Sequence, residues 1–212
     1  MKRILTITAG ISLAFFILTS SVMLTLSIKD TYQLSQAEIV QREYQLDDTT
    51  IKENYNGLID YMFKGPDAKL SFQKLPMSPE GEIHFKEVKE IFQFFFKGMV
   101  ISGLISLFLG AWLIRNKDLG FLNLGSLLVF LVPAILSIPV LINFNWTFTK
   151  FHELAFSNDY WIFDPRLDPI IDYLPESLFL KNTLIILAII VVWILLLQLL
   201  RKLLKNKIQL AS

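Results

Sequence analysis

The chain contains no cysteine and only two histidines among its 212 residues. Without a thiol it can form no disulfide, no thiolate nucleophile, no thiolate metal site and no lipid linkage on a cysteine of its own. Charged residues are also scarce, at 18%, whereas hydrophobic residues make up 53%. The net charge of +1 gives no reason to expect a nucleic-acid partner. This composition is typical of an integral membrane protein.

Four apolar runs approach or exceed the roughly 20 residues that a bilayer-spanning helix needs. We therefore predict a mainly α-helical integral membrane protein with four transmembrane helices and an extracytoplasmic cap built from the two outer loops. The predicted segments are the N-terminus with the first transmembrane helix (1–28), the first outer loop (29–97), the second helix (98–114), a cytoplasmic loop (115–120), the third helix (121–141), the second outer loop (142–182), the fourth helix (183–200) and a basic cytoplasmic tail (201–212).

The first apolar run follows Lys2 and Arg3, as the core of a signal peptide would. Its uncharged length of 25 residues is long for such a core, and no A-x-A cleavage site follows it. We therefore interpret it as a permanent helix. The four spans carry no charged residue between their ends. Transporters and channels usually need polar groups inside the membrane, so this composition argues against transport.

The distribution of charge predicts the orientation in the membrane. With both termini inside, the inner segments hold eight basic residues and one acid, a charge of +7, and the remainder holds 12 basic and 18 acidic residues, a charge of −6. Cytoplasmic segments are enriched in lysine and arginine. We therefore expect cytoplasmic termini, with both long loops, and both histidines, outside the membrane.

The first outer loop has the pattern of a folded cap. Between residues 50 and 64 the apolar residues recur with the spacing of one face of a helix, and Gly65-Pro66 ends the pattern. Ser78 is the expected N-cap of a second helix, with Pro79 at its first position, and this helix should continue into the second span. His84 and Glu87 lie one turn apart on it.

The second outer loop should begin as an extension of the third span. Phe148, His152 and Phe156 are spaced by four residues and would share one helix face. Residues 157–169 are rich in turn-forming residues. The aromatic residues of this loop predict either an opening for acyl chains or an ordinary interfacial belt. Both histidines should lie near the same membrane surface, where they can converge.

Two histidines can supply a base and an acid, because imidazole exchanges protons near neutral pH. The plainer alternative is that each ring only forms hydrogen bonds at a wet interface. A zinc site is a weaker possibility, because no paired-histidine motif is present. No G-x-S-x-G motif is present either. The sequence thus offers proton-transfer groups without an obvious nucleophile.

Two stretches carry a resemblance to a known family. They are SPEGEIHFKEVK, which contains His84, and FTKFHELAFSNDYWIFDPRLDPIIDYLPESLF, which contains His152. In a four-span chain of this length they resemble the bacterial lipoprotein intramolecular transacylases. The resemblance implies an acyltransferase that moves the sn-2 acyl chain of a diacylglyceryl lipoprotein to the α-amino group of its N-terminal cysteine, giving a lyso-form lipoprotein. The family's two essential histidines carry over to His84 and His152.

The resemblance also implies a multi-pass protein of the bacterial cell membrane, with a diacylated lipoprotein as substrate and membrane lipids as neighbours. We expect no cofactor and no metal. Supporting or substrate-binding roles are predicted for Glu87, Asn158, Trp161 and Asp164. Two alternatives remain open: a non-enzymatic scaffold or accessory protein of the cell envelope, and a lipid hydrolase or intermolecular acyltransferase. The reaction in the family needs no enzyme nucleophile, because the substrate supplies its own amine.

Overall fold

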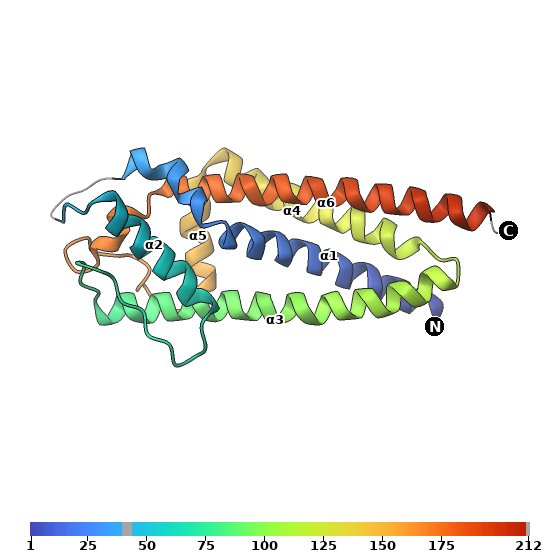
Figure 1. Cartoon of the computed structure of the whole chain (residues 1–212), viewed down its shortest axis with the longest axis horizontal. Helices are drawn as coiled ribbons and strands as arrows, with labels where there is room; N and C mark the ends of the chain where they lie inside the picture. Colours follow the sequence, from blue (N-terminus) through green and yellow to red (C-terminus); the bar gives the residue numbers. More distant parts are fainter. Residues whose placement is uncertain (40–43, 211–212) are drawn as a thin grey trace. The chain divides into compact units, whose positions relative to one another are not determined.

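The structure is a computed structural model that describes residues 1–39 and 44–210. Every regular element in these residues is a helix (Figure 1). In chain order the elements are α1 (Lys2–Ser27), η1 (Lys29–Glu38), α2 (Asp48–Phe63), α3 (Pro79–Arg115), α4 (Gly120–Ile142), α5 (Phe144–Ala155), η2 (Pro169–Tyr173) and α6 (Glu176–Leu210), where η marks a 3-10 helix.

Four of these helices, α1, α3, α4 and α6, are long and apolar enough to cross a membrane. The prediction of a mainly α-helical membrane protein with four spanning helices is confirmed. Helices α3 and α6 contain 37 and 35 residues, well beyond the roughly 20 that a bilayer requires. The first turns of α3 therefore belong outside its apolar span.

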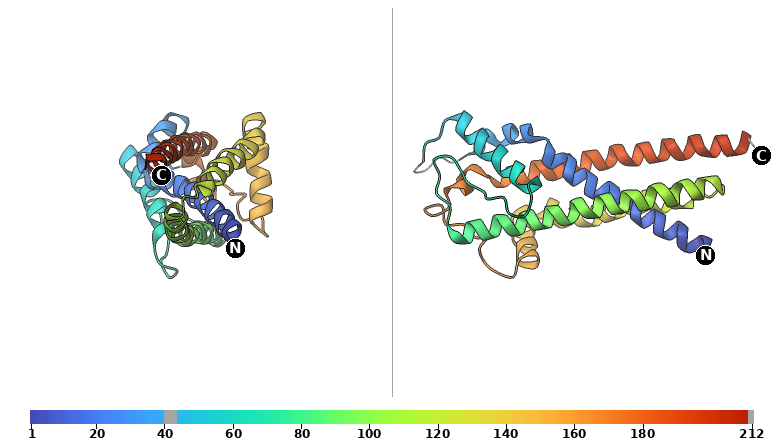
Figure 2. Two further views of the ribbon diagram at one scale, coloured as in Figure 1. Left: turned by 90° about the vertical axis from the view of Figure 1, so that its right-hand side faces the viewer. Right: turned by 60° about the horizontal axis from the view of Figure 1, so that its bottom comes forward.

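The chain divides into two compact units, and each is described by itself. Unit 1 comprises Met1–Leu24, Phe95–Ile138 and Ile185–Ser212, which are drawn from the four spanning helices. The N-terminus and the C-terminal end of α6 lie at the same end of this unit (Figures 1 and 2). Its core joins all four helices through the buried residues Ala9, Ala14, Ile17, Leu113, Phe121, Leu122, Val129, Ile190 and Leu197.

Close approach of α1 and α4 in unit 1 depends on glycine. A Cβ on Gly10 would lie 2.9 Å from the Cβ of Leu124, and a Cβ on Gly125 would lie 2.9 Å from Leu13 Cδ2. Each glycine thus makes room for a leucine of the facing helix, as small residues commonly do where membrane helices pack. Apolar side chains elsewhere on these helices remain exposed, which suits contact with lipid.

Unit 2 comprises Thr25–Phe94 and Pro139–Leu184, so the two long connecting segments fold together as one body with its own core. The predicted amphipathic helix is present as α2, with Asp47 as N-cap accepting from the Thr50 N–H. Its apolar face is buried, at 3–5% exposure, through Ile51, Tyr55, Leu58, Ile59 and Met62. Burial of this face stabilises the helix more than its intrinsic propensity does.

The start of α3 is held by a buried carboxylate. Ser78 Oγ accepts from the Gly81 N–H, as predicted for an N-cap, and Asp168 in turn accepts from both the N–H and the hydroxyl of Ser78 at 2.7 and 2.6 Å. A Cβ on Gly81 would lie only 2.3 Å from Asp168 Oδ1. Glycine at this position therefore allows the second connecting segment to close onto α3.

The predicted extension of the third span is wrong, because α4 ends at Ile142. Asn143 is extended, with φ −156° and ψ 96°, and its side chain accepts from the Trp146 N–H as the N-cap of a new helix. The separate helix α5 carries His152 in its last turn. Phe156, which was expected on the same helix face, follows as the extended C-cap residue.

Candidate functional site

The two histidines meet in unit 2. His84 lies on the first turns of α3 and His152 on the last turn of α5, and their ring centroids are 6.0 Å apart at an interplanar angle of 38°. Both side chains are buried, with exposures of 5% and 9%. Burying a polar ring costs free energy unless the ring is hydrogen-bonded. The two histidines of the chain are nevertheless buried next to each other, which marks this place as a candidate site.

Aromatic rings enclose the histidine pair. Phe156 contacts both rings, with centroid distances of 4.7 Å to His84 and 5.6 Å to His152. Phe163 packs edge-on to His84 at 5.4 Å. On the other side, Phe148 and Trp161 lie 4.1 and 5.0 Å from His152. The surroundings are therefore apolar, and they strengthen any electrostatic interaction made inside them.

A backbone carbonyl fixes the tautomer of His152. Its Nδ1 lies 2.7 Å from the Phe148 carbonyl oxygen, which can only accept a hydrogen bond. Nδ1 therefore carries the proton, and Nε2 of the neutral ring presents a lone pair. The chain achieves this within one helix, because residue 148 lies one turn before residue 152.

Both rings favour the neutral form. Burial and, to a smaller extent, the nearby His152 lower the pKa of His84 from its ordinary 6.5 to about 4. Burial also lowers the pKa of His152, although its bond to Phe148 opposes the shift. At neutral pH the site therefore presents two uncharged imidazoles, each able to accept a proton but not charged beforehand to give one.

Two predicted supporting residues pair with each other. Asn158 Nδ2 donates to Glu87 Oε1 at 2.8 Å, although 71 residues separate them. The Tyr160 N–H donates to Asn158 Oδ1 at 3.0 Å, which fixes the amide with its nitrogen toward the carboxylate. Glu87 follows His84 by one turn of α3. The structure thus brings Glu87, Asn158, Trp161 and both histidines together.

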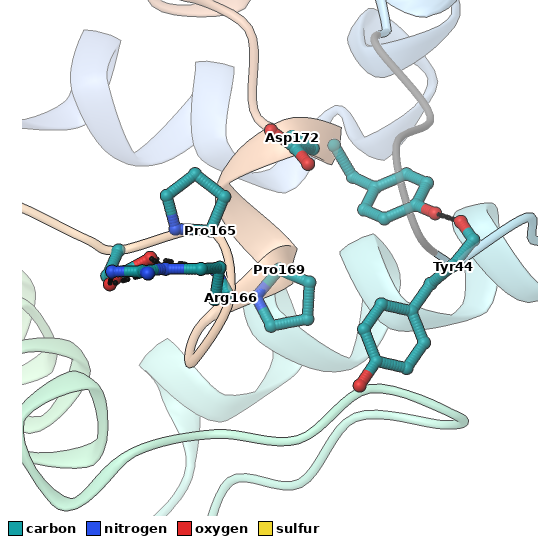
Figure 3. A pocket seen from close by; sticks show the side chains of 7 residues that line it. Tyr44, Pro165, Arg166, Pro169 and Asp172 are labelled. Atoms are coloured by element: carbon teal, nitrogen blue, oxygen red, sulfur yellow. Dashed lines mark hydrogen bonds and ion pairs between the residues drawn. The ribbon is translucent and has the colours of Figure 1, made fainter.

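Asp164 is engaged elsewhere. Its carboxylate forms a bidentate ion pair with Arg166, which lowers the Asp164 pKa to about 2. The two side chains lie at a separate hollow of about 220 Å³ in unit 2, together with Tyr44, Pro169 and Asp172 (Figure 3). Tyr173 closes one side of this hollow by donating to the Tyr44 carbonyl. Because its carboxylate is paired with Arg166, Asp164 does not orient either histidine ring in this structure.

Comparison with known proteins identifies the family. A family model described as "Lipoprotein intramolecular transacylase Lit" matches residues 7–179, most of the chain. The chain belongs to this family. Because members of this family transfer an acyl group, the chain is an acyltransferase. No curated protein matches it.

Solved structures agree with the family assignment. The chain is similar to the membrane integral lipoprotein intramolecular transacylase Lit from Bacillus cereus, at 34% identity over 99% of this chain and 98% of that one, with a TM-score of 0.92. It is also similar to two forms of the Bacillus cereus protein in which one histidine is replaced by arginine or by alanine. These are 33% and 34% identical, cover 100% and 99% of this chain and 95% and 96% of their own chains, and have TM-scores of 0.87.

Two residues near the candidate site make contacts that their positions in the sequence did not predict. Phe163, in the turn-rich segment, packs on both His84 and Phe85. Asp168 appears in the sequence as half of an Asp-Pro turn, yet it caps the helix that carries His84. A buried carboxylate opposite a helix N-terminus is favourable, but the pairing spans 90 residues and has no local signature. In the residues that the structure describes, no group of three metal-ligating side chains comes together.

Proposed function

We propose that this chain moves the sn-2 acyl chain of a diacylglyceryl lipoprotein to the α-amino group of its N-terminal cysteine, leaving a lyso-form lipoprotein. Family membership supports the reaction class. The observation that carries the proposed chemistry is the adjacency of His84 and His152, 6.0 Å apart in an aromatic enclosure. The chain needs no serine or cysteine nucleophile, because the substrate's amine attacks the substrate's ester.

His152 acts as the base in this proposal. Its Nε2 lone pair accepts a proton from the attacking amine, and the Phe148 carbonyl supports the resulting imidazolium through Nδ1–H. His84 then passes a proton to the departing glyceryl oxygen while it accepts one from His152 on its other nitrogen. One proton in total moves from the amine nitrogen to the oxygen, an N–C bond forms and an O–C bond breaks.

A hydrogen-bond donor must stabilise the oxyanion that forms during attack. Asn158 is a weaker candidate than its sequence position predicts, since its amide is already bonded to Glu87 and to the Tyr160 N–H. The indole N–H of Trp161 is buried without a partner and lies in the ring that packs on His152. We assign the oxyanion contact to Trp161.

The proposal places the reaction at the outer surface of the bacterial cell membrane, with cytoplasmic termini. The charge difference between the short and long connecting segments supports this orientation. Lipoproteins with an exposed N-terminal cysteine and two acyl chains would then reach unit 2 by lateral diffusion. Labelling of single cysteines introduced near residue 212 and into α2, using a reagent that cannot cross membranes, tests the orientation.

The decisive experiment measures product from a diacylated lipopeptide by mass spectrometry, with purified full-length protein in lipid nanodiscs. His84→Ala and His152→Ala should each reduce lyso-form product by about a hundredfold to ten-thousandfold, the usual contribution of acid–base catalysis. Glu153→Gln is the matched control, because Glu153 is exposed and lies next to His152 on α5. Normal product from either histidine variant would refute the assigned chemistry.

The same assay separates the alternatives. A scaffold or accessory protein would yield no product even as the wild-type protein. A lipid hydrolase would release free fatty acid without acylating the amine. An intermolecular acyltransferase would transfer a labelled chain from a second lipid, whereas intramolecular transfer leaves that label behind.

A further inference from the structure

Unpaired polar atoms concentrate around the histidine pair. In the residues that the structure describes, eight buried side-chain nitrogen or oxygen atoms have no hydrogen-bond partner, and three belong to this site. The three are His84 Nδ1, Glu87 Oε2 and Trp161 Nε1. Buried polar groups are ordinarily satisfied, so a group of unpaired ones indicates the place of a ligand.

Asn158 fixes the position of the Glu87 carboxylate. Its amide donates to Glu87 Oε1, and Glu87 Oε2 is buried without a hydrogen-bond partner. The Tyr160 N–H in turn holds Asn158 by its oxygen. This chain of contacts fixes the carboxylate one helical turn from His84 without neutralising it with a cation. The positively charged groups nearest in sequence, Lys86 and Lys89, do not compensate it, because Lys86 is exposed and Lys89 donates to the Gly65 carbonyl.

The chemistry of the free atoms defines what they can bind. A carboxylate oxygen only accepts hydrogen bonds, and it prefers a charged donor. An indole N–H only donates, and so requires an acceptor such as a carbonyl oxygen. A ligand that satisfies both must present a cationic N–H group close to a carbonyl. A free α-ammonium group beside an ester has this arrangement.

We infer that Glu87 is the binding residue for the free α-ammonium group of the diacylated substrate, and that Asn158 is the positioning residue that holds it. This inference rests on the proposed function. It explains how the site would select lipoproteins with a free N-terminus over those already acylated on nitrogen. Binding as an ammonium also brings the nitrogen into the site. The ammonium gives up its first proton to water, and the neutral amine then attacks and passes its second proton through the histidine pair to the glyceryl oxygen.

The test uses a ligand that cannot react, a dialkylglyceryl-cysteinyl peptide with ether linkages in place of the esters. Its affinity for full-length protein in nanodiscs is measured with a free α-amine and with that amine acetylated. Wild-type protein should prefer the free amine by about tenfold to a hundredfold, the range expected for a hydrogen bond to a charged group. Glu87→Gln should reduce the preference to about twofold or less while the acetylated ligand binds as before.

Two controls make the result decisive. Glu90→Gln changes an exposed carboxylate three residues after Glu87 on α3 and should leave the preference for the free amine unchanged. Unchanged binding of the acetylated ligand shows that Glu87→Gln is folded. A preference retained in Glu87→Gln, or absent from wild-type protein, would overturn the inference. His84→Ala should retain the preference while losing turnover, so a failure of the proposed catalysis is seen separately from a failure of amine recognition.

Discussion

Units 1 and 2 satisfy their buried polar groups in different ways. In the helix interiors of unit 1 the hydroxyls bond to carbonyls of their own helix: Thr19 to Phe15, Ser20 and Ser21 to Ile17, and Ser106 to Ser102. In unit 2 the polar contacts join segments far apart in sequence, such as Asp168 with Ser78 and Asn158 with Glu87. A hydroxyl bonded within its own helix leaves that helix free to contact lipid. Hydrogen bonds between distant segments, by contrast, hold the side chains of the candidate site in place.

The two kinds of contact predict different costs when a polar side chain is removed. Removing a local hydroxyl leaves the helix's own backbone ladder intact. Removing one member of a long-range pair leaves its buried partner without a hydrogen bond, which costs that partner's desolvation penalty. Unit 1 also has longer-range side-chain bonds, from Thr6 to Asp118 and from Lys2 to the Asn116 carbonyl, but both join the first turns of α1 to the loop between α3 and α4, where the groups are exposed or partly exposed. We therefore expect large effects in unit 2 and small ones in unit 1.

The largest effect on stability should come from the contact between Gly81 and Asp168. Gly81→Ala places a Cβ 2.3 Å from Asp168 Oδ1 and should destabilise the protein by about 2 kcal/mol, in the range of core overpacking. Asp168→Ala should cost about 2–3 kcal/mol, because Ser78 loses two hydrogen bonds to a carboxylate. In the Asp168→Ala background, however, Gly81→Ala should be neutral or stabilising, since alanine is the better helix former.

A double-mutant cycle measures this coupling from thermal unfolding midpoints of the detergent-solubilised protein. Equal costs of Gly81→Ala in both backgrounds would contradict the structure's close contact. Gly57→Ala provides the matched control, because a Cβ at Gly57 in α2 meets nothing within 4 Å.

Much of the fold was predictable because it depends on local patterns. Bilayer-length apolar runs identify the four spans, and the stripe through α2 identifies a helix whose apolar face is buried. The break at Asn143 was missed, because Ile142, Phe144 and Trp146 continue the apolar character of the third span and a single asparagine does not by itself mark the start of a new helix. Both histidines were predictable as a pair because the chain has no others. The Asp168 contact was not, because only the folded chain brings residues 78 and 168 together.

Acid pH should destabilise the folded protein through His84. His84 has a pKa of about 4 in the folded protein, below its ordinary 6.5. As pH falls below about 6.5 the unfolded chain takes up a proton that the folded site resists until about pH 4. The free energy of unfolding should therefore decrease across this window. Unit 1 contains no histidine, so this histidine-linked change arises in unit 2.

Thermal midpoints at pH 7.5 and pH 5.0 test this for wild-type protein and for His84→Gln. The wild-type midpoint should fall by several degrees more than that of the variant, because carboxylates that titrate in the same window affect both proteins alike. Equal decreases in the two proteins would show that His84 is not held neutral by the fold.

The smallest effect is expected in unit 1, at Ser106. Its hydroxyl donates to the Ser102 carbonyl at 2.7 Å, within α3. Ser106 also lines an apolar hollow of about 480 Å³ together with Leu13, Phe16, Met99, Val100, Gly103, Leu104 and Leu107. Ser106→Ala should change stability by less than about 0.5 kcal/mol and product formation by less than about twofold, since the carbonyl keeps its backbone partner.

Asn158→Ala in unit 2 is the matched comparison, because it also removes one small polar side chain. It frees Glu87 to rotate and should reduce product formation by about tenfold or more, in proportion to the loss of a hydrogen bond to a charged group. If Ser106→Ala reduced turnover as much as Asn158→Ala, a polar group among the membrane helices would take part in the reaction. The assignment of lipid contact to unit 1 and of the chemistry to unit 2 would then be wrong.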